Sequence, residues 1–367
     1  MIYIIVFAIS LLLLYASIKA KKKPAKILFF ALSIIIPCIL ASLRSINMTV
    51  DTMIYIEPLF KIAKKANFFD YIFNNGITND VLYLIVSYVC AKISSSISVL
   101  FFAMELLVLA PLYIAIRRRY DKPFYVVLAA MAALALLYNA SFNMARQAIS
   151  LSFFVLAVEY LFEGKNKKYW LLSIAAFFMH WSAFIAFPIA FIIHRIKVSD
   201  KKTITGLGFV AIAIVGFFIV GSMNTFLNAI NLGNLKIVEY ISNHSMTEYT
   251  SNATADTLFF VFIYIVIKLF RRPSRGNNKN EDDAFSLLTL LGLIVMQYGA
   301  FIEYGFRLSY YFLYPVLILY VPKICETQKR NNAVILTLTI FMSLIFYWVF
   351  WVIISNYHDT YPFIMAR

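Results

Sequence analysis

The sequence predicts an all-α polytopic membrane protein with about 12 transmembrane crossings and additional re-entrant or interfacial helices. Composition is the first reason: hydrophobic residues make up 62% of the chain and charged residues 14%. A soluble globular domain has about 45–50% apolar and about 25% charged residues. The second reason is that the apolar residues gather in runs close to about 20 residues, the length that spans a bilayer as a helix. The third is that basic residues collect in alternate gaps between these runs.

Most of the apolar runs are long enough for one crossing each. They cover residues 2–18, 27–43, 98–116, 123–139, 145–162, 204–222, 256–270, 284–302, 307–322 and 332–354. Two further stretches fit a single crossing badly. Residues 80–96 contain Asp80 and other polar groups, which favours an interfacial or re-entrant helix. Residues 169–194 are too many for one upright span and too few for two, so they predict a short hairpin that turns near His180 and Trp181.

The basic residues predict the topology, because basic loops stay on the cytoplasmic side of a membrane. Of the 33 Lys and Arg residues, 24 lie in the segments 19–26, 117–122, 165–168, 195–202, 268–279 and 323–330. If 80–96 does not cross and 169–194 is a hairpin, these 24 are inside and 9 are outside. This topology places both termini and Asn143 outside. The net charge of +15 then reflects topology and contact with anionic lipid, and it does not indicate nucleic-acid binding.

An alternative topology has 80–96 as a crossing and 169–194 as one tilted span. It moves the loops at 117–122 and 163–168 outward and leaves 19 basic residues inside and 14 outside. The first topology therefore agrees better with the distribution of charge.

The whole chain, 1–367, is interpreted as a single transmembrane domain with two long outer segments. The first, 44–79, contains the amphipathic stretch Pro58–Phe73, which resembles a helix lying in the interface plane. The second, 223–255, is rich in polar residues and predicts an outer loop.

Three arginines fall on the outer face, which is otherwise depleted of basic residues: Arg44, Arg146 and Arg307. An arginine near the membrane core costs roughly 2.5–3.5 kcal/mol on insertion scales, and such residues usually face a polar cavity. Several converging guanidinium groups would suit a diphosphate, because their planar donor geometry matches phosphate oxygens. The alternative is that each arginine reaches to the interface without binding a ligand.

The outer face also carries candidate proton acceptors. His180 lies at the predicted hairpin turn, where it can act as a base near neutral pH or bond to backbone groups exposed by the turn. Asp51 precedes Tyr55 by four residues, so a helix would bring both to the same side, and Glu303 is a third acceptor. A solvated loop carboxylate is the alternative for Asp51.

Several motifs that activate substrates are missing from the sequence. It contains no glycine-rich phosphate loop, no HExxH, no CxxC and no GxSxG, and its three cysteines are scattered. We therefore expect no metal and no cofactor, and the energy for any reaction must come with the substrate.

At these residues the chain resembles the EpsG-like branch of Wzy-type polysaccharide polymerases. The similar motifs are Arg44…Asp51-x-x-x-Tyr55, Asn143-x-x-Arg146-Gln147, His180-x-Ser182-Ala183, Arg307-x-x-Tyr310 and Tyr361-Pro362. The chain departs from the family at Thr49-Val50, where a Gly-Thr pair commonly precedes the first-loop aspartate.

The resemblance implies a metal-independent glycosyltransferase of the GT-C type in the bacterial cytoplasmic membrane. Such an enzyme moves a glycan from undecaprenyl diphosphate onto a lipid-linked repeat unit on the outer face. Its implied partners are this lipid-linked oligosaccharide, as donor and acceptor, the bilayer and a chain-length regulator protein. The roles carried over are catalysis by His180 or Asp51, diphosphate binding by Arg44, Arg146 and Arg307, and substrate binding by Tyr55, Asn143, Gln147, Glu303 and Tyr310.

Other functions stay open. A glycolipid flippase would need charged residues at mid-membrane positions in several spans, and these are few here. An O-antigen-ligase-like enzyme would use the same donor with another acceptor. A membrane O-acetyltransferase fits less well, because its acyl donor arrives from the cytoplasm and the candidate residues face outward.

Overall fold

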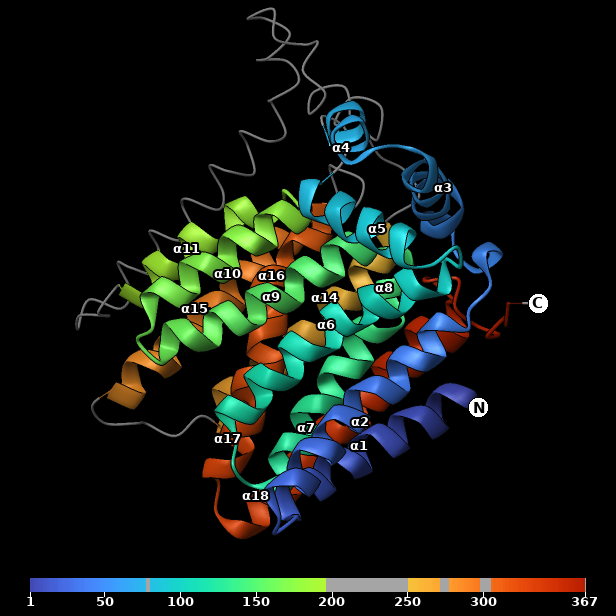
Figure 1. Cartoon of the computed structure of the whole chain (residues 1–367). Coiled ribbons are helices and arrows are strands. Elements are labelled where there is room, and N and C mark those ends of the chain that lie inside the picture. The colour runs from blue at the N-terminus through green and yellow to red at the C-terminus, as the bar shows by residue number, and fades with distance from the viewer. Residues whose placement is uncertain (77–79, 196–249, 271–276, 298–304, 367) are drawn as a thin grey trace, which may run out of the picture. The chain divides into compact units, whose positions relative to one another are not determined.

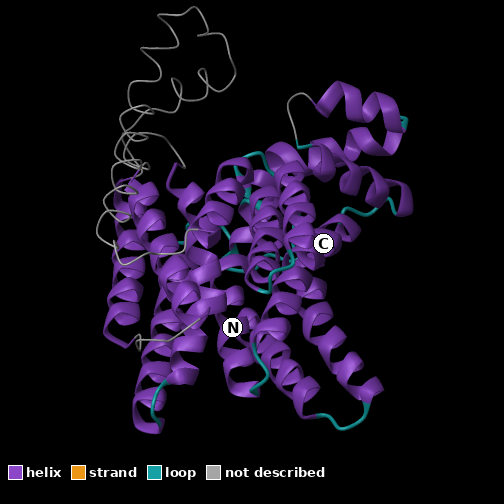
Figure 2. Cartoon of the chain, turned by 90° about the vertical axis from the view of Figure 1, so that its left-hand side faces the viewer, coloured by secondary structure: helices purple, strands orange, loops and turns teal. Residues whose placement is uncertain are grey.

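The computed structural model describes residues 1–76, 80–195, 250–270, 277–297 and 305–366. Every named element in these ranges is helical, as Figures 1 and 2 show, which confirms the all-α fold class. The chain divides into two compact units. Unit 1 is Met1–Phe184 with Leu317–Arg367, and unit 2 is Ile185–Val316.

Unit 1 contains most of the described helices. They are α1 (Ile2–Lys19), α2 (Lys23–Ser42), η1 (Ile46–Met48), η2 (Thr52–Ile56), α3 (Glu57–Lys65), α4 (Phe68–Gly76), α5 (Val81–Ile93), α6 (Ser98–Arg119), α7 (Pro123–Ala133), η3 (Leu134–Tyr138), α8 (Ala140–Asn143), α9 (Ala145–Phe162), α10 (Asn166–Met179), α17 (Val321–Thr327), α18 (Arg330–Trp348) and η7 (Val349–Ile354). The helices that lie in or extend into unit 2 are α11 (Ala183–Arg195), α14 (Thr250–Phe270), α15 (Asn277–Met296), η5 (Gly305–Ser309), α16 (Tyr310–Pro315) and η6 (Val316–Tyr320).

Seven helices in the described part of the chain are long and apolar enough to cross a membrane. They are Ile2–Lys19, Lys23–Ser42, Ser98–Arg119, Pro123–Asn143, Ala145–Phe162, Gly305–Thr327 and Arg330–Ile354. All seven correspond to predicted spans, and the chain is a multi-pass membrane protein. The predicted span 204–222 lies outside the described residues, and the helices that contain 256–270 and most of 284–302 are not among these seven, so about 12 crossings stays a prediction.

Neighbouring helices of unit 1 pack side by side. Helix α1 packs on α2, α2 on α6, α6 on α9 and α9 on α10. Arg44, just after α2 ends, contacts Phe101 near the start of α6, so α2 and α6 run in opposite directions. Unit 1 therefore has two ends, which we call the site end, where α6 begins, and the basic end, where α6 finishes.

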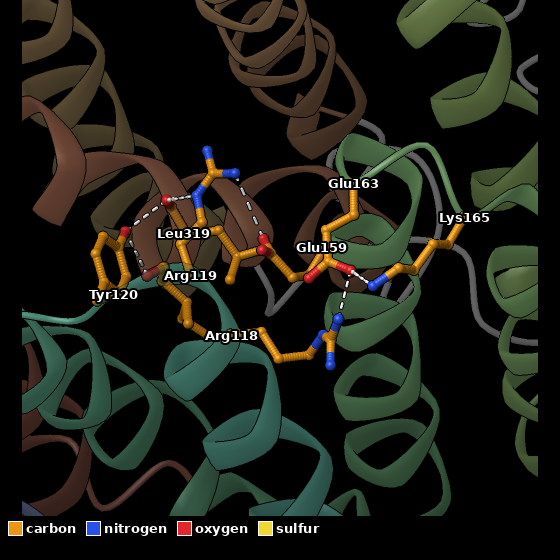
Figure 3. Close-up of polar contacts among 8 residues, drawn as sticks. Arg118, Arg119, Tyr120, Glu159, Glu163, Lys165 and Leu319 are labelled. Atoms are coloured by element: carbon orange, nitrogen blue, oxygen red, sulfur yellow. Dashed lines mark hydrogen bonds and ion pairs between the residues drawn. The ribbon is translucent and has the colours of Figure 1, made fainter. Parts of the chain in front are cut away.

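Polar contacts join three of the basic segments at the basic end, as Figure 3 shows for two of them. Arg118 Nη2 lies 2.5 Å from Glu163 Oε2, whose other cationic neighbour is Lys165 Nζ at 2.7 Å. Lys122 Nζ lies 3.0 Å from Glu326 Oε1. Exposed ion pairs of this kind add only about 0–1 kcal/mol each to the stability of the protein. Their importance here is that they show which loops lie next to one another.

These contacts decide between the two topologies. The segments 117–122, 163–168 and 323–330 are at one end of unit 1, and 19–26 is at the same end because α2 and α6 run in opposite directions. The alternative topology, which places 117–122 and 163–168 opposite 323–330, is therefore wrong. The length of α5 also contradicts the alternative topology, in which 80–96 crosses the membrane. The 13 residues of this helix rise only about 20 Å, which is too short for a crossing, and α6 then starts at the site end.

Prolines in the helices leave carbonyl groups that side chains satisfy. Pro37 has no N–H for the carbonyl of Ser33, four residues earlier, and the Ser10 hydroxyl donates to that oxygen at 2.6 Å. Pro322 likewise cannot bond to Ile318, and the Tyr120 hydroxyl lies 3.4 Å from that carbonyl oxygen.

Tyr120 also donates to the carbonyl of Leu319 at 2.5 Å, and Arg119 Nε reaches the same carbonyl at 3.2 Å (Figure 3). Arg119 Nη1 lies 3.5 Å from Glu159 Oε2. These bonds hold α6, α9 and η6 together at the basic end.

Two interrupted helices affect the site. Helix α10 ends at Met179 and α11 begins at Ala183, so the predicted interruption at His180 and Trp181 is confirmed. The stretch Pro58–Phe73, expected as one amphipathic helix, is instead two helices, α3 and α4. The Asn67 side chain accepts from Asp70 N at 2.9 Å and starts α4 there.

The C-terminal tail packs on the site end. Ser45 N donates to the carbonyl of Ile364 at 2.8 Å, and Ala366 N donates to the carbonyl of Leu43 at 2.9 Å. The Tyr3 hydroxyl donates to the carbonyl of Thr360 at 2.7 Å. The two termini therefore lie at the same end of unit 1, as Figure 1 shows.

The topology predicts different labelling at the two ends of unit 1. Lys61 and Lys167 are both exposed, at the α3 segment and at the basic end. In a variant without the native cysteines, we expect an impermeant thiol reagent on intact cells to label Lys61→Cys but not Lys167→Cys. After the cells are opened, both should be labelled. Labelling of the Lys167 variant alone in intact cells would reverse the orientation of the protein.

Candidate functional site

Asp80 contacts two of the predicted site residues, Arg146 and His180. It is the residue before α5, and its side chain is 10% exposed. Its Oδ2 lies 3.4 Å from Arg146 Nη1 and 3.2 Å from His180 Nδ1. Its Oδ1 accepts from the backbone N–H of Trp181 at 3.3 Å. We call Asp80, Arg146, His180 and Trp181 the Asp80 cluster, and all of it belongs to unit 1.

Arg146 is the second residue of α9, and this position needs an anion nearby. The first turn of a helix has partial positive charge because its N–H groups point out of the helix, so a cation there is unfavourable on its own. The Asp80 carboxylate supplies the missing negative charge. The Arg146 side chain is 22% exposed, so part of it remains accessible. Helix N-termini also bind phosphates, which makes this end of α9 suitable for an anionic ligand.

His180 lies in the break between α10 and α11. Its backbone is extended, with φ −163° and ψ 121°, and its N–H completes the last turn of α10 by donating to Ala176. The imidazole is 20% exposed and contacts Asp80 through Nδ1. The side chain thus contacts a carboxylate, whereas the alternative role was a histidine that bonds to backbone exposed by the turn.

Aromatic rings surround the guanidinium of Arg146. Its Cζ lies 5.4 Å from the centre of the Tyr55 ring and 5.9 Å from that of Tyr83. Tyr55 is 45% exposed, whereas Tyr83 is 1% exposed. Such contacts attract a cation by about 0.5–2 kcal/mol and limit its movement. The Tyr83 hydroxyl is buried, and burial raises its pKa above the ordinary value of tyrosine.

Asp51 and Asn143 are joined directly. The Asn143 side chain accepts a hydrogen bond from the Asp51 backbone N–H at 3.1 Å, which fixes the start of η2 against the end of α8. Asp51 thus leads into the turn that carries Tyr55, while Asn143 is three residues before Arg146. Four of the predicted residues are therefore held where η2 and α8 meet the start of α9.

Thr49 explains how the chain tolerates its departure from the family motif. Its hydroxyl lies 2.8 Å from the Thr52 hydroxyl oxygen and 2.8 Å from the carbonyl oxygen of Phe142. Thr49 is fully buried. It therefore fastens the Asp51 turn to α8, and the following residue, Val50, is exposed.

Arg44 has different surroundings from Arg146. It is 2% exposed, and its Cζ lies 4.0 Å from the centre of the Phe101 ring and 4.3 Å from that of Phe142. Burial lowers the pKa of Arg44 to about 10, and the nearby Glu105 opposes this effect. Arg44 is thus a charged residue packed between two rings. Its predicted role as a diphosphate ligand remains a prediction.

Four predicted site residues remain, Gln147, Arg307, Tyr310 and Glu303. Gln147 follows Arg146 in α9 and is 7% exposed. Arg307 and Tyr310 belong to unit 2, where the Tyr310 hydroxyl donates to Asp256 Oδ2 at 2.5 Å. Glu303 lies outside the described residues. Most of the predicted outer loop, from 223 to 249, does so too.

Two aspartates were missed by the sequence analysis. Asp80 was interpreted only as a reason why 80–96 makes a poor membrane span, and Asp256 as the first residue of a span. The signal for both was the same: a single carboxylate at the start of an apolar run, where it must find a donor or a cation. Tyr310 and the pair Arg146 and His180 are those partners here.

The Asp80 cluster has the groups for acid–base chemistry beside an arginine that can bind an anion. It offers a guanidinium that can bind phosphate oxygens, an imidazole that can exchange a proton, and a carboxylate between them. In the described part of the chain, no group of three or more His, Cys, Asp or Glu residues could hold a metal ion.

Comparison with known proteins identifies a family. The model of the EpsG family matches residues 26–365, which is nearly the whole chain and includes every residue of the Asp80 cluster. This match confirms the resemblance that the sequence motifs indicated. No curated protein and no solved structure matches the chain.

Arg44→Lys tests whether this arginine is structural. An ammonium group cannot stack on both rings, so we expect the variant to lose roughly 2 kcal/mol of stability. A lower midpoint of thermal unfolding in detergent would measure this loss. Binding of a polyprenyl diphosphate by the folded fraction should stay close to that of the unmodified protein. Unchanged stability with lost binding would instead assign Arg44 to the ligand.

Proposed function

The chain belongs to the EpsG family, and we propose that it is a polysaccharide polymerase of the membrane glycosyltransferase type. In this proposal it moves a glycan chain from undecaprenyl diphosphate onto a lipid-linked repeat unit. The reaction takes place on the outer face of the bacterial cytoplasmic membrane, without a metal ion. Membership of a Wzy-like polymerase family supports the general activity.

The Asp80 cluster is the observation that carries the proposal. His180 Nδ1 and Arg146 Nη1 contact one carboxylate oxygen, at 3.2 and 3.4 Å, so these two nitrogens are no farther apart than the sum of the two distances. The transfer needs this proximity, because the acceptor hydroxyl and the diphosphate leaving group meet at one carbon atom of the donor sugar.

Arg146 would bind the diphosphate of the donor. As the bond from the anomeric carbon to the phosphate oxygen breaks, negative charge increases on the leaving undecaprenyl diphosphate. A guanidinium with several N–H groups stabilises that charge, and the N-terminus of α9 adds to the effect. The exposed ring of Tyr55 beside Arg146 offers a surface on which a sugar can stack.

His180 would take the proton of the acceptor. The acceptor oxygen forms a bond to the anomeric carbon, and its proton passes to the ring nitrogen that does not contact Asp80. Undecaprenyl diphosphate leaves with the electron pair of the broken bond. Asp51 is the alternative base; otherwise it orients the acceptor sugar, together with Asn143, to which its backbone is bonded.

The remaining assignments follow from the same proposal. The site end of unit 1 would be extracytoplasmic, as would both termini, and the basic end would face the cytoplasm. The diphosphate would also contact Arg307, and the sugars would contact Gln147, Glu303 and Tyr310. A chain-length regulator protein is a further proposed partner, and nucleic acid is not.

Two other functions share part of this support. An O-antigen-ligase-like enzyme would use the same donor site with another acceptor. A glycolipid flippase would need ionisable groups along a path through the membrane, whereas the Asp80 cluster is located at helix ends. The one-ended position of the cluster favours an enzyme over a flippase.

Deletion of the gene tests the function as a whole. We expect the ladder of long surface polysaccharide to disappear from a gel while single repeat units remain, because polymerisation stops after the units are exported. Expression of the intact gene should restore the ladder. Loss of all surface glycan would indicate a flippase, and a normal ladder would exclude the polymerase.

Arg146→Lys tests the diphosphate contact. Charge is kept, but a point ammonium cannot form the paired bonds of a guanidinium, so we expect about a 10–100-fold loss of polymer synthesis at equal protein level. Arg330→Lys, at an exposed position of the basic end, is the matched control and should be active. Full activity of the Arg146 variant would leave this arginine without a role in binding.

His180→Ala and Asp51→Asn separate the two candidate bases. We expect His180→Ala to abolish polymerisation while the donor lipid still binds, because Arg146 is intact. Asp51→Asn should raise the acceptor concentration needed for half-maximal rate and leave the maximal rate within about threefold. An active His180 variant together with an inactive Asp51 variant would exchange the two roles.

A further inference from the structure

Asp80 connects three elements of the site end through three contacts. Its two oxygens reach Arg146 at the start of α9, His180 at the end of α10 and the backbone of Trp181 before α11. These elements are separated in the sequence and contribute both reactive side chains. One carboxylate is therefore responsible for the position of both.

We propose that Asp80 is a positioning residue that selects the reactive tautomer of His180 and holds Arg146 beside it. The proposal rests on the proposed function, which it deepens by naming the group that aligns the base with the diphosphate site. Asp80 itself touches neither substrate.

The chemistry of the contact determines the tautomer. A neutral imidazole has one N–H, and an ionised carboxylate can only accept hydrogen bonds. The 3.2 Å contact of Asp80 Oδ2 with Nδ1 therefore places the hydrogen on Nδ1 and leaves a lone pair on Nε2. Nε2 is then the nitrogen that can receive the acceptor proton. When it does, the imidazolium that forms is stabilised by the same carboxylate.

The contact with Trp181 keeps the carboxylate oriented. Its Oδ1 accepts the Trp181 N–H at 3.3 Å, so the group cannot rotate freely about its own bond, and Oδ2 stays directed at His180. Since Trp181 is the next residue after His180, the loop and the imidazole are fixed together.

The contact with Arg146 brings the diphosphate site to the base. Arg146 Nη1 approaches the same Oδ2, at 3.4 Å, and the Tyr55 and Tyr83 rings restrict the guanidinium from other directions. A guanidinium carries five N–H donors, so a contact at Nη1 is compatible with binding of phosphate oxygens. His180, the proposed base, and Arg146, the proposed diphosphate-binding residue, thus contact the same oxygen of Asp80.

Asp80→Asn tests the proposal, because the amide keeps the size of the side chain and can still accept from Trp181. It lacks the charge, and its NH2 group can donate to Nδ1, which would place the hydrogen on Nε2. We expect kcat for a lipid-linked repeat unit to fall at least about 10-fold. The donor KM should change less than about threefold, because the Arg146 charge remains and the Tyr55 and Tyr83 rings still restrict the guanidinium. Asp70→Asn, an exposed aspartate bonded to Asn67, is the matched control and should keep the kcat of the unmodified protein.

The tautomer can be measured without turnover. The chain has four histidines, and ¹⁵N spectra of the labelled protein compared with a His180→Gln variant identify the His180 signals. We expect the hydrogen on Nδ1 in the unmodified protein and a shift of population to the Nε2-protonated form in Asp80→Asn. A wild-type kcat in Asp80→Asn, or hydrogen on Nε2 in the unmodified protein, would overturn the proposal.

This spectrum also separates the proposal from the proposed function. If the gene deletion leaves the polymer ladder intact while His180 is protonated on Nδ1, the polymerase assignment fails and the Asp80–His180 contact stands. If Asp80→Asn does not fold, the spectrum of the unmodified protein still decides the tautomer. A fall in kcat with an unchanged tautomer would count against the selection of the tautomer by Asp80.

Discussion

A polar group that leaves water must find a partner within the protein, and in a membrane protein this requirement decides where helices can be broken. Unit 1 meets it with side chains from neighbouring helices. Ser10 and Tyr120 satisfy carbonyls for which Pro37 and Pro322 have no N–H. At the site end the same requirement acts on charges, and Asp80 is held by a cation, an imidazole and a backbone N–H.

The site is built from helix ends because only there can the backbone change direction and still be satisfied. Helix α5 starts after Asp80, α9 starts next to Arg146, and α10 finishes before His180. Each end supplies one functional group, and the dipoles of α5 and α9 favour an anion at their first turns. Arg44, packed between Phe101 and Phe142, stabilises the neighbouring segment from which Asn143 and Arg146 emerge. A change at Arg44 is therefore expected to affect both the stability of unit 1 and the position of the site residues Asn143 and Arg146.

The sequence predicted the long spans well because length and hydropathy alone determine them, as the span 145–162 illustrates. It also predicted the break at His180 from the length of 169–194. It did not predict that Pro58–Phe73 is interrupted, since that depends on the capping of α4 by Asn67. Asp80 was missed as a site residue because its role depends on partners about 66 and 100 residues away, which only packing brings together.

Reconstitution tests most directly whether this protein joins lipid-linked repeat units through the Asp80 cluster. Purified protein in vesicles would be given repeat units carried on undecaprenyl diphosphate, without nucleotide or added metal ion. We expect a ladder of longer glycans, with one undecaprenyl diphosphate released for each new linkage. Movement of repeat units across the vesicle membrane with no new linkage and no release would contradict this expectation.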